Sequence, residues 1–396
     1  MDRSREPVLV EGLRTPIGKA PRGVLKSARP DELAAGVIRD VLRRAPEIGL
    51  GGIEDVVLGC AFPEGPQGMN VGRIAALLAG LPDEVPGMTL NRFCASGLEA
   101  VALAADRIRT GQADILLAGG TESMSLVPMG GASFQPNPRL VKESPDVYLS
   151  MGLTAERVAR LFGVSREDQD AFALESHRRA VAASDQGRFE RETAPVSVVS
   201  RRPGPDGEAV ETVATVSRDE GPRRDTSLEA LRALPPAFLA GGTVTAGNAS
   251  QMSDGAAALL VMSRSKAEAS GLRPRAVFRG YATAGVAPGI MGIGPVVAVP
   301  KLLERAGLSV GEIDLFEINE AFASQILHVR RTLGIDPGRL NVWGGAIALG
   351  HPLGATGARL AVTLLHQMEE RDARWGVAAM CVGGGMGAAA LLERDT

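Results

Sequence analysis

The stretch Ala113-Asp114-Ile115-Leu116-Leu117-Ala118-Gly119-Gly120 decides the fold of this chain. It is a short apolar run that follows a helical segment of small residues over 95–109, and it ends in two glycines. A run of this length that is bounded by glycine predicts a buried strand rather than another helix. We expect Gly119 and Gly120 to form a turn where the strand at 114–118 ends.

The residues before this stretch show the same alternation of strand and helix. Expected strands lie at 7–12, 55–60 and 88–93, and expected helices lie at 31–42 and 72–78. Strands that alternate with helices of this length predict parallel sheets covered by helices. The predicted fold class is therefore α/β.

The last third of the chain resembles the first third. Ile53-Glu54-Asp55-Val56-Val57-Leu58 is similar to Glu312-Ile313-Asp314-Leu315-Phe316-Glu317. The stretch at 113–120 is likewise similar to Gly376-Val377-Ala378-Ala379-Met380-Cys381-Val382-Gly383. Repeats in the same order predict two duplicated α/β halves, although buried strands also resemble one another by chance.

The middle of the chain, from Thr121 to about Ser250, has a different composition. It is rich in Pro, Arg, Glu and Ser, with helical stretches at 154–161 and 167–183. Residues 201–220 are polar and turn-rich, and we expect loops or exposed strands there. Such a segment is typical of an insertion that covers a site rather than of a sheet of its own. The expected units are an N-terminal half over 1–121 plus about 252–273, an inserted loop domain over 122–251 and a C-terminal half over 274–396.

Composition argues against several classes of partner. At 396 residues the chain exceeds the usual size of one hydrophobic core, so two or three packed units are expected. Only 4% of the residues are aromatic and the net charge is −3, and neither favours a nucleic-acid partner. No apolar run has membrane-spanning length and no signal peptide is recognisable, so we expect a cytoplasmic protein with no membrane span. Three cysteines far apart are expected to be reduced thiols rather than a disulfide framework.

The first candidate for chemistry is Cys94, in Asn91-Arg92-Phe93-Cys94-Ala95-Ser96-Gly97-Leu98. It lies between an expected strand and an expected helix, where the positive end of the helix dipole and free N–H groups would lower the pKa of the thiol. The small residues after Cys94 leave room for a substrate to approach the sulfur. The alternative is a cysteine buried as a small hydrophobic residue.

Two further candidates lie in glycine-rich turns. His351, in Trp343-Gly344-Gly345-Ala346-Ile347-Ala348-Leu349-Gly350-His351-Pro352-Leu353-Gly354, has few bulky neighbours and is suited to take a proton from a thiol. Cys381 begins Cys381-Val382-Gly383-Gly384-Gly385-Met386-Gly387, whose N–H groups could hold an oxyanion, although such a turn can also serve packing alone. The pairwise spacings of compact zinc sites are absent, so no metal site is expected.

Four blocks together resemble the signatures of the thiolase family. They are Asn91 to Val101, Asn319-Glu320-Ala321-Phe322-Ala323, Gly344 to Gly357 and Cys381 to Gly387. The resemblance covers nearly the whole chain, from Arg14-Thr15-Pro16-Ile17-Gly18 onward. It implies the thiolase fold, in which two duplicated α/β halves form a five-layered αβαβα sandwich with an inserted loop domain.

The resemblance also implies a role for each catalytic residue. Cys94 matches the nucleophile, His351 the base that activates it, and Cys381 the thiol that protonates or deprotonates the α-carbon. Asn319 matches the residue that positions a water, which forms one oxyanion hole with His351. The backbone N–H groups of Cys94 and Gly383 match the second hole. Coenzyme A and acyl-CoA are then substrates, and no metal or redox cofactor is required.

The loop domain is expected to hold coenzyme A (CoA). Ser250, in Thr245-Ala246-Gly247-Asn248-Ala249-Ser250, matches a residue that contacts the pantetheine arm, and Arg223 matches one near the ADP portion. Ala246 is also expected to contact CoA, and the expected walls of the pantetheine and acyl pocket are Met151, Phe238, Met291 and Phe322. The alternatives are core packing for the apolar residues and a solvated charge for Arg223.

Several stretches resemble the degradative 3-ketoacyl-CoA branch of the family. They are Asn91-Arg92, Met151-Gly152-Leu153-Thr154-Ala155-Glu156 and Ile290-Met291-Gly292-Ile293-Gly294-Pro295. Ser150 stands where acetoacetyl-CoA thiolases commonly have histidine, which counts against an enzyme restricted to C4 substrates. Trp343 stands where many members have asparagine, and this difference bears on loop packing and chain-length preference. We expect a thiolase of fatty-acid β-oxidation, with acetoacetyl-CoA thiolase as the alternative.

Other classes fit the residues less well. A ketoacyl synthase would not carry the second cysteine, a non-catalytic scaffold would have lost one of the four catalytic residues, and an NAD-dependent enzyme would open with a Gly-x-Gly-x-x-Gly turn. The resemblance further implies a homodimer or homotetramer, with a β-oxidation complex as a possible partner.

Overall fold

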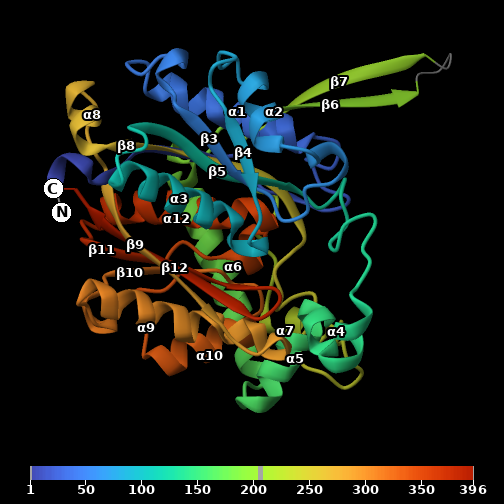
Figure 1. The fold of residues 1–396 in the computed structure, drawn as a ribbon. Helices are drawn as coiled ribbons and strands as arrows, with labels where there is room; N and C mark the ends of the chain where they lie inside the picture. The colour runs from blue at the N-terminus through green and yellow to red at the C-terminus, as the bar shows by residue number, and fades with distance from the viewer. Residues whose placement is uncertain (1, 204–207, 396) are drawn as a thin grey trace.

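A large mixed sheet forms the framework of the molecule (Figure 1). The structure, a computed structural model, describes residues 2–203 and 208–395. Nine strands follow the order β10-β11-β12-β9-β1-β8-β5-β3-β4, and β2 pairs with β8. The strands are β1 Pro7–Arg14, β2 Gly18–Lys19, β3 Asp55–Gly59, β4 Gly87–Leu90, β5 Ile115–Ser123, β8 Ser253–Ser263, β9 Ala276–Gly285, β10 Leu315–Ile318, β11 Trp375–Val382 and β12 Met386–Arg394.

Two halves of the same topology meet at the centre of this sheet. β1 and β9 pair there in antiparallel fashion, with Val8 opposite Val277 and Leu9 opposite Ala276. Outward from this line the order is β1-β8-β5-β3 in one half and β9-β12-β11-β10 in the other. In each half the last two strands are parallel and the remaining neighbours are antiparallel. The similar stretches at 53–58 and 312–317 thus occupy equivalent strands, and the predicted duplication is confirmed.

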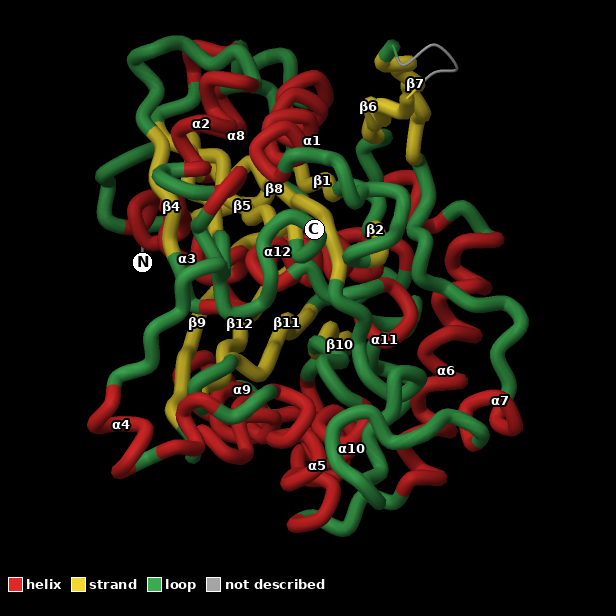
Figure 2. Tube along the Cα trace, turned by 90° about the vertical axis from the view of Figure 1, so that its right-hand side faces the viewer, coloured by secondary structure: helices red, strands yellow, loops and turns green. Residues whose placement is uncertain are grey.

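Helices form three layers around the two halves (Figures 1 and 2). α3 Ser96–Arg109 and α12 Leu353–Glu370 pack against each other and against strands of both halves, which makes the central layer. Every residue of α12 from Leu353 to Met368 is buried, as expected of a helix enclosed on all sides. The outer layers are α1 Pro30–Arg44 with α2 Val71–Leu78 on one face and α9 Gly294–Ala306 with α10 Ala323–Leu333 on the other. The result is the predicted five-layered αβαβα sandwich.

The middle of the chain wraps one end of the sandwich. Its helices are α4 Pro138–Glu143, α5 Met151–Leu161, α6 Arg166–Asp185 and α7 Leu228–Arg232. The strands β6 Val196–Pro203 and β7 Ala209–Val216 form a hairpin that projects from the body (Figure 1). Loops or exposed strands are expected over 201–220, of which 204–207 lie outside the described residues. The expectation that this segment has no sheet of its own is wrong, since the hairpin is a two-stranded sheet. The two remaining helices are α8 Arg264–Ala269 and α11 Ala346–Leu349.

Two predicted boundaries are wrong. Gly119 and Gly120 form no turn, because β5 continues through them to Ser123. A Cβ atom at either glycine would lie 2.0 Å from a backbone carbonyl oxygen, so both are needed where chains pack closely rather than where the chain turns. The strand expected at 88–93 ends at Leu90, because the chain then enters the 3₁₀ turn η4 Phe93–Ala95. No helix in the described part of the chain is long and apolar enough to cross a bilayer.

Candidate active site

A cavity of about 440 Å³ collects most of the residues predicted to act or to bind. It lies where residues 150–152 at the start of α5, residue 223 and the segment 237–252 meet η4 and the end of β11. Its lining includes Cys94, His351 and Cys381, together with all seven residues predicted to contact CoA: Met151, Arg223, Phe238, Ala246, Ser250, Met291 and Phe322.

Cys94 sits in a tight turn that is held by its neighbours. Phe93 has a φ of 44°, in the left-handed region that side chains rarely adopt. The Phe93 N–H donates to Oδ1 of Asn91 at 2.7 Å, and the Ser96 hydroxyl donates to the Phe93 carbonyl at 2.7 Å. These contacts hold Cys94 at the cavity wall two residues before α3 begins.

The Cys94 thiol is not activated by its position alone. Burial raises its pKa to about 11, although the backbone N–H groups of Gly383 and of Cys94 itself act in the opposite direction. The prediction that the helix N-terminus lowers this pKa is therefore wrong, because desolvation outweighs the nearby dipoles. Cys94 rests as a thiol and needs a base.

His351 is a neutral imidazole in a defined tautomer. Its Nδ1 atom lies 2.6 Å from the Thr356 hydroxyl, which donates its own proton to the Pro352 carbonyl at 2.7 Å. Thr356 must therefore accept the proton of Nδ1, which leaves the lone pair on Nε2. Burial, with the nearby charge of Arg359, lowers the pKa of His351 to about 3. The imidazole is thus a neutral base whose acceptor atom is Nε2.

Asn319 faces that same nitrogen. Its side-chain Nδ2 lies 3.2 Å from Nε2 of His351, and its buried Oδ1 makes no hydrogen bond with any described residue. Asn319 does not line the cavity itself, so it approaches the imidazole from within the protein. An open carbonyl oxygen beside the imidazole is suited to hold a water molecule.

Cys381 lies near the end of β11, surrounded by apolar side chains. Burial raises the pKa of its thiol, and the proximity of Cys94 raises it further. Its apolar neighbours are Met151, Ala155, Val244, Ala249, Met291, Ala321 and Phe322. Gly383 follows in the turn before β12, where its N–H points at the Cys94 sulfur. The two thiols therefore share one water-poor environment.

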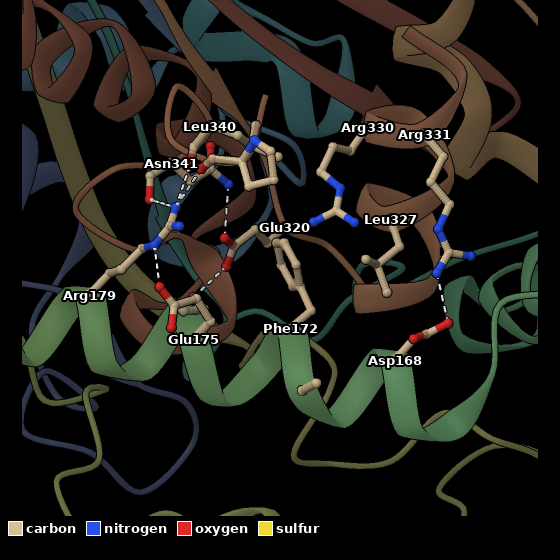
Figure 3. A pocket seen from close by; sticks show the side chains of 13 residues that line it. Asp168, Phe172, Glu175, Arg179, Glu320, Leu327, Arg330, Arg331, Leu340 and Asn341 are labelled. Atoms are coloured by element: carbon tan, nitrogen blue, oxygen red, sulfur yellow. Dashed lines mark hydrogen bonds and ion pairs between the residues drawn. The ribbon is translucent and has the colours of Figure 1, made fainter. Parts of the chain in front are cut away.

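The loop that carries His351 is anchored by a buried carboxylate that the sequence analysis did not identify. Glu320, next to Asn319, accepts the Ser176 hydroxyl at 2.7 Å, the Asn341 amide at 2.8 Å and the Ile347 N–H at 3.2 Å. These contacts lie behind a second cavity of about 220 Å³ between α6 and α10 (Figure 3). None of the predicted site residues lines that second cavity.

A second carboxylate supports the other side of the loop. Glu122, at the end of β5, accepts the backbone N–H groups of Gly354 and Ala61, each at 2.8 Å. It is almost fully buried and ties the start of α12 to the loop after β3. The expected turn at Gly119-Gly120 would end the strand before Glu122, so the sequence pattern gives no sign that Glu122 lies inside the sheet.

Trp343 lies away from the cavity. Its indole is 2% exposed and packs edge-on against Phe189, with ring centroids 5.9 Å apart. It does not line the pocket, so its effect is on loop packing and not on the pocket walls. The lining also includes Ser150, and four residues for which the sequence gives no signal: Lys19, Met124, Gln251 and Met252.

Comparisons with known proteins agree with this geometry. Residues 7–265 match the family model "Thiolase, N-terminal domain", and residues 272–394 match "Thiolase, C-terminal domain". The chain is 52% identical to the 3-ketoacyl-CoA thiolase of Bacillus subtilis (strain 168) over 389 residues, which is 98% of this chain and 99% of that protein.

Two solved structures are similar over the whole chain. The Bacillus anthracis acetyl-CoA acetyltransferase has a TM-score of 0.90 at 39% identity, covering 98% of this chain and 99% of that one. The dimeric peroxisomal thiolase of Saccharomyces cerevisiae has a TM-score of 0.90 at 41% identity, covering 100% and 99%. The chain belongs to the thiolase family.

Proposed function

We propose that this protein is a 3-ketoacyl-CoA thiolase, which cleaves a 3-ketoacyl-CoA with free CoA to give acetyl-CoA and a shortened acyl-CoA. The observation that carries the proposal is the meeting of a half-buried thiol, a buried thiol and one neutral imidazole in a single cavity. A neutral base beside a protonated nucleophile is the starting state for covalent acyl transfer.

In the first half of the cycle, His351 takes the proton of Cys94 and the resulting thiolate attacks the 3-keto carbon. The bond between that carbon and the α-carbon breaks, which leaves an acyl group on Cys94 and the enolate of acetyl-CoA. Cys381 gives its proton to the α-carbon, and acetyl-CoA leaves. The enzyme then holds an acyl-cysteine, a Cys381 thiolate and a protonated His351, so charge is conserved.

In the second half, the thiol of free CoA attacks the acyl group and its proton goes to Cys381. The thiolate of Cys94 leaves and recovers its proton from His351, and all three groups return to their starting state. Protonated His351 and thiolate Cys381 are both stabilised by lying close together in a low-dielectric cavity.

Two carbonyl oxygens become negative during the cycle, and each needs its own donors. We assign the N–H groups of Cys94 and Gly383 to the oxygen of the acyl group on Cys94. We assign His351 and a water held by Asn319 to the oxygen of the enolate. CoA and acyl-CoA enter as substrates, and the cycle requires no resident cofactor.

We propose a role in fatty-acid β-oxidation, with substrates longer than four carbons. The cavity wall is mostly apolar and offers Met151, Met291 and Phe322 to an alkyl chain. The relationship to the B. subtilis protein supports this assignment. Acetyl-CoA C-acetyltransferase is the second candidate, favoured by the structural similarity to the B. anthracis protein of that name.

We also propose that the protein is cytoplasmic and acts as a homodimer or homotetramer, with a β-oxidation complex as a candidate partner. The structural similarity to a dimeric thiolase supports the oligomer. Light scattering of the purified protein tests it directly, and a monomer at micromolar concentration would contradict it.

The function is tested by CoA-dependent cleavage of 3-ketoacyl-CoA substrates from C4 to C16, with wild type beside Cys94→Ala and Cys381→Ala. Activity that extends beyond C4 and is lost in both variants is the expected result. Activity confined to C4 would select the acetyltransferase. No cleavage at any length by folded wild type would favour a non-catalytic scaffold.

A further inference from the structure

The segment from Asp219 to Arg223, which leads to the predicted ADP contact, is fixed to the sandwich at its start. The buried guanidinium of Arg14 donates to both carboxylate oxygens of Asp219, at 2.7 and 2.8 Å. Asp219 also accepts the Ile17 N–H at 2.9 Å. A charged group bound on both sides in a buried position leaves this end of the segment little freedom.

The next residue holds the neighbouring turn. The carboxylate of Glu220 accepts the backbone N–H groups of Lys19 and Val24, at 2.9 and 3.1 Å, and the Glu220 N–H donates to the Ile17 carbonyl at 3.1 Å. These bonds bring Lys19, in β2, close to the segment that ends at Arg223. Lys19 and Arg223 both line the 440 Å³ cavity.

The end of the segment is held by a histidine that the proposed reaction does not use. The backbone N–H of Arg223 donates to Nδ1 of His177 at 3.1 Å. His177 lies on α6 and is 3% exposed. Burial lowers its pKa to about 4, and the nearby charges of Arg223 and Lys19 act in the same direction while Asp225 opposes them. His177 is therefore neutral and keeps a lone pair for this bond.

Two cations at the cavity wall have no internal partner. Neither the Lys19 ammonium nor the Arg223 guanidinium makes a hydrogen bond or ion pair with another residue in the described ranges 2–203 and 208–395. Lys19 is half-buried, where a cation is normally paired, and Arg223 is exposed. Two such groups beside a cavity are suited to the phosphates at the nucleotide end of CoA.

We infer that His177 is a positioning residue for the nucleotide end of CoA, because its bond to the Arg223 N–H holds the backbone that carries the guanidinium, at a cavity that Lys19 also lines. This inference rests on the proposed use of CoA but adds two residues, His177 and Lys19, to its recognition. Loss of the His177 acceptor leaves the part-buried N–H of Arg223 without its side-chain partner and removes the contact that holds this stretch of backbone.

The test compares the binding of CoA with that of pantetheine, which lacks the phosphorylated nucleotide, by calorimetry on the full chain. His177→Leu removes the acceptor at similar volume, whereas His177→Asn keeps an oxygen near the position of Nδ1. We expect His177→Leu to weaken CoA binding about tenfold, the effect of one lost hydrogen bond. Pantetheine should bind equally to all three proteins, and His177→Asn should bind CoA nearly as wild type does.

A second pair of variants keeps the test decisive. If His177→Leu does not fold, as judged by circular dichroism, His177→Gln takes its place, because its amide reaches the position of Nε2 and not that of Nδ1. Lys19→Gln should also weaken CoA binding without changing the affinity for pantetheine.

The inference is overturned if His177→Leu, or His177→Gln in its place, binds CoA as wild type does, or if it loses affinity for pantetheine to the same extent. Because binding is measured without turnover, a wild type that binds CoA but cleaves no 3-ketoacyl-CoA would contradict the proposed function alone.

Discussion

The hydroxyl of Thr356 sets the tautomer of His351. It accepts from Nδ1 at 2.6 Å and donates to the Pro352 carbonyl at 2.7 Å, so its own proton is committed and the imidazole proton must lie on Nδ1. The basic lone pair then faces Asn319 on Nε2. Thr356 does not line the cavity, and acts through the histidine.

Thr356→Val should lower kcat/KM for 3-ketoacyl-CoA by about 10- to 100-fold, the usual effect of removing a group that orients a catalytic histidine. The change keeps the shape of the side chain and removes only the hydroxyl. Thr356→Ser is the matched control and should retain most of the activity. Equal kcat/KM values for the two variants would show that the hydroxyl does not orient the base.

Cys94 should react slowly with an alkylating agent near neutral pH and faster as the pH rises. Its pKa is raised to about 11, so between pH 7 and 9 the thiolate fraction grows about tenfold per pH unit. The measurement is the rate of iodoacetamide labelling at Cys94, by mass spectrometry, in a Cys381→Ala background. A rate that is already constant below pH 7 would mean a resting thiolate–imidazolium pair and would contradict the neutral pair described above.

Glu320→Gln should destabilise the protein by about 1–3 kcal/mol, because an amide cannot accept all three of the donors that the carboxylate accepts. The same change should lower kcat, since the loop at 344–350 carries His351. Glu175→Gln on α6 is the control, because Glu175 is half-exposed and pairs with Arg179 near the surface (Figure 3). A surface pair contributes at most about 1 kcal/mol. Denaturant unfolding that shows similar losses for both variants would refute the anchoring role of Glu320.

His366 should make the protein less stable in acid. Burial and the adjacent Arg275 lower its pKa in the folded state to about 3, against an ordinary value of 6.5. Between those values the unfolded chain binds a proton that the folded protein does not, so the His366 contribution is present above pH 6.5 and is lost as the pH falls.

Urea unfolding of wild type and His366→Gln at pH 7, 6, 5 and 4 measures the contribution of His366. The difference in the free energy of unfolding between wild type and variant should change in favour of the variant, by up to about 1.4 kcal/mol for each unit that the pH falls. A difference that stays constant or grows over this range would mean that His366 becomes protonated in the folded protein.

Much of the framework follows from the pattern of apolar runs. The predicted helices and strands of the first third of the chain are of the correct type. The similar stretches in the first and last thirds correctly predict two halves of the same topology. The turn at Gly119-Gly120 is a wrong prediction because glycine also serves where backbones pack closely, and only the contacts with the Ala257 and Gly354 carbonyls distinguish the two cases.

The sequence predicts the site residues whose side chains are themselves reactive. It does not predict residues whose function depends on a partner that is distant in the sequence. Cys94, His351 and Cys381 stand out in the sequence by their glycine-rich surroundings. Thr356, Glu320 and His177 do not, since their partners lie on other elements or depend on the local fold. The direction of the Cys94 pKa was missed for the same reason, because burial is a property of the assembled layers.

The most direct test of the proposed mechanism is mass spectrometry of the protein after incubation with a 3-ketoacyl-CoA in the absence of free CoA. We expect wild type to carry the shortened acyl group on Cys94 and to release one equivalent of acetyl-CoA. Cys381→Ala should release acetyl-CoA much more slowly, because the enolate lacks its proton donor. An acyl group found on Cys381 or Cys60, or acetyl-CoA released by Cys94→Ala at the wild-type rate, would contradict the assignment of Cys94 as the nucleophile.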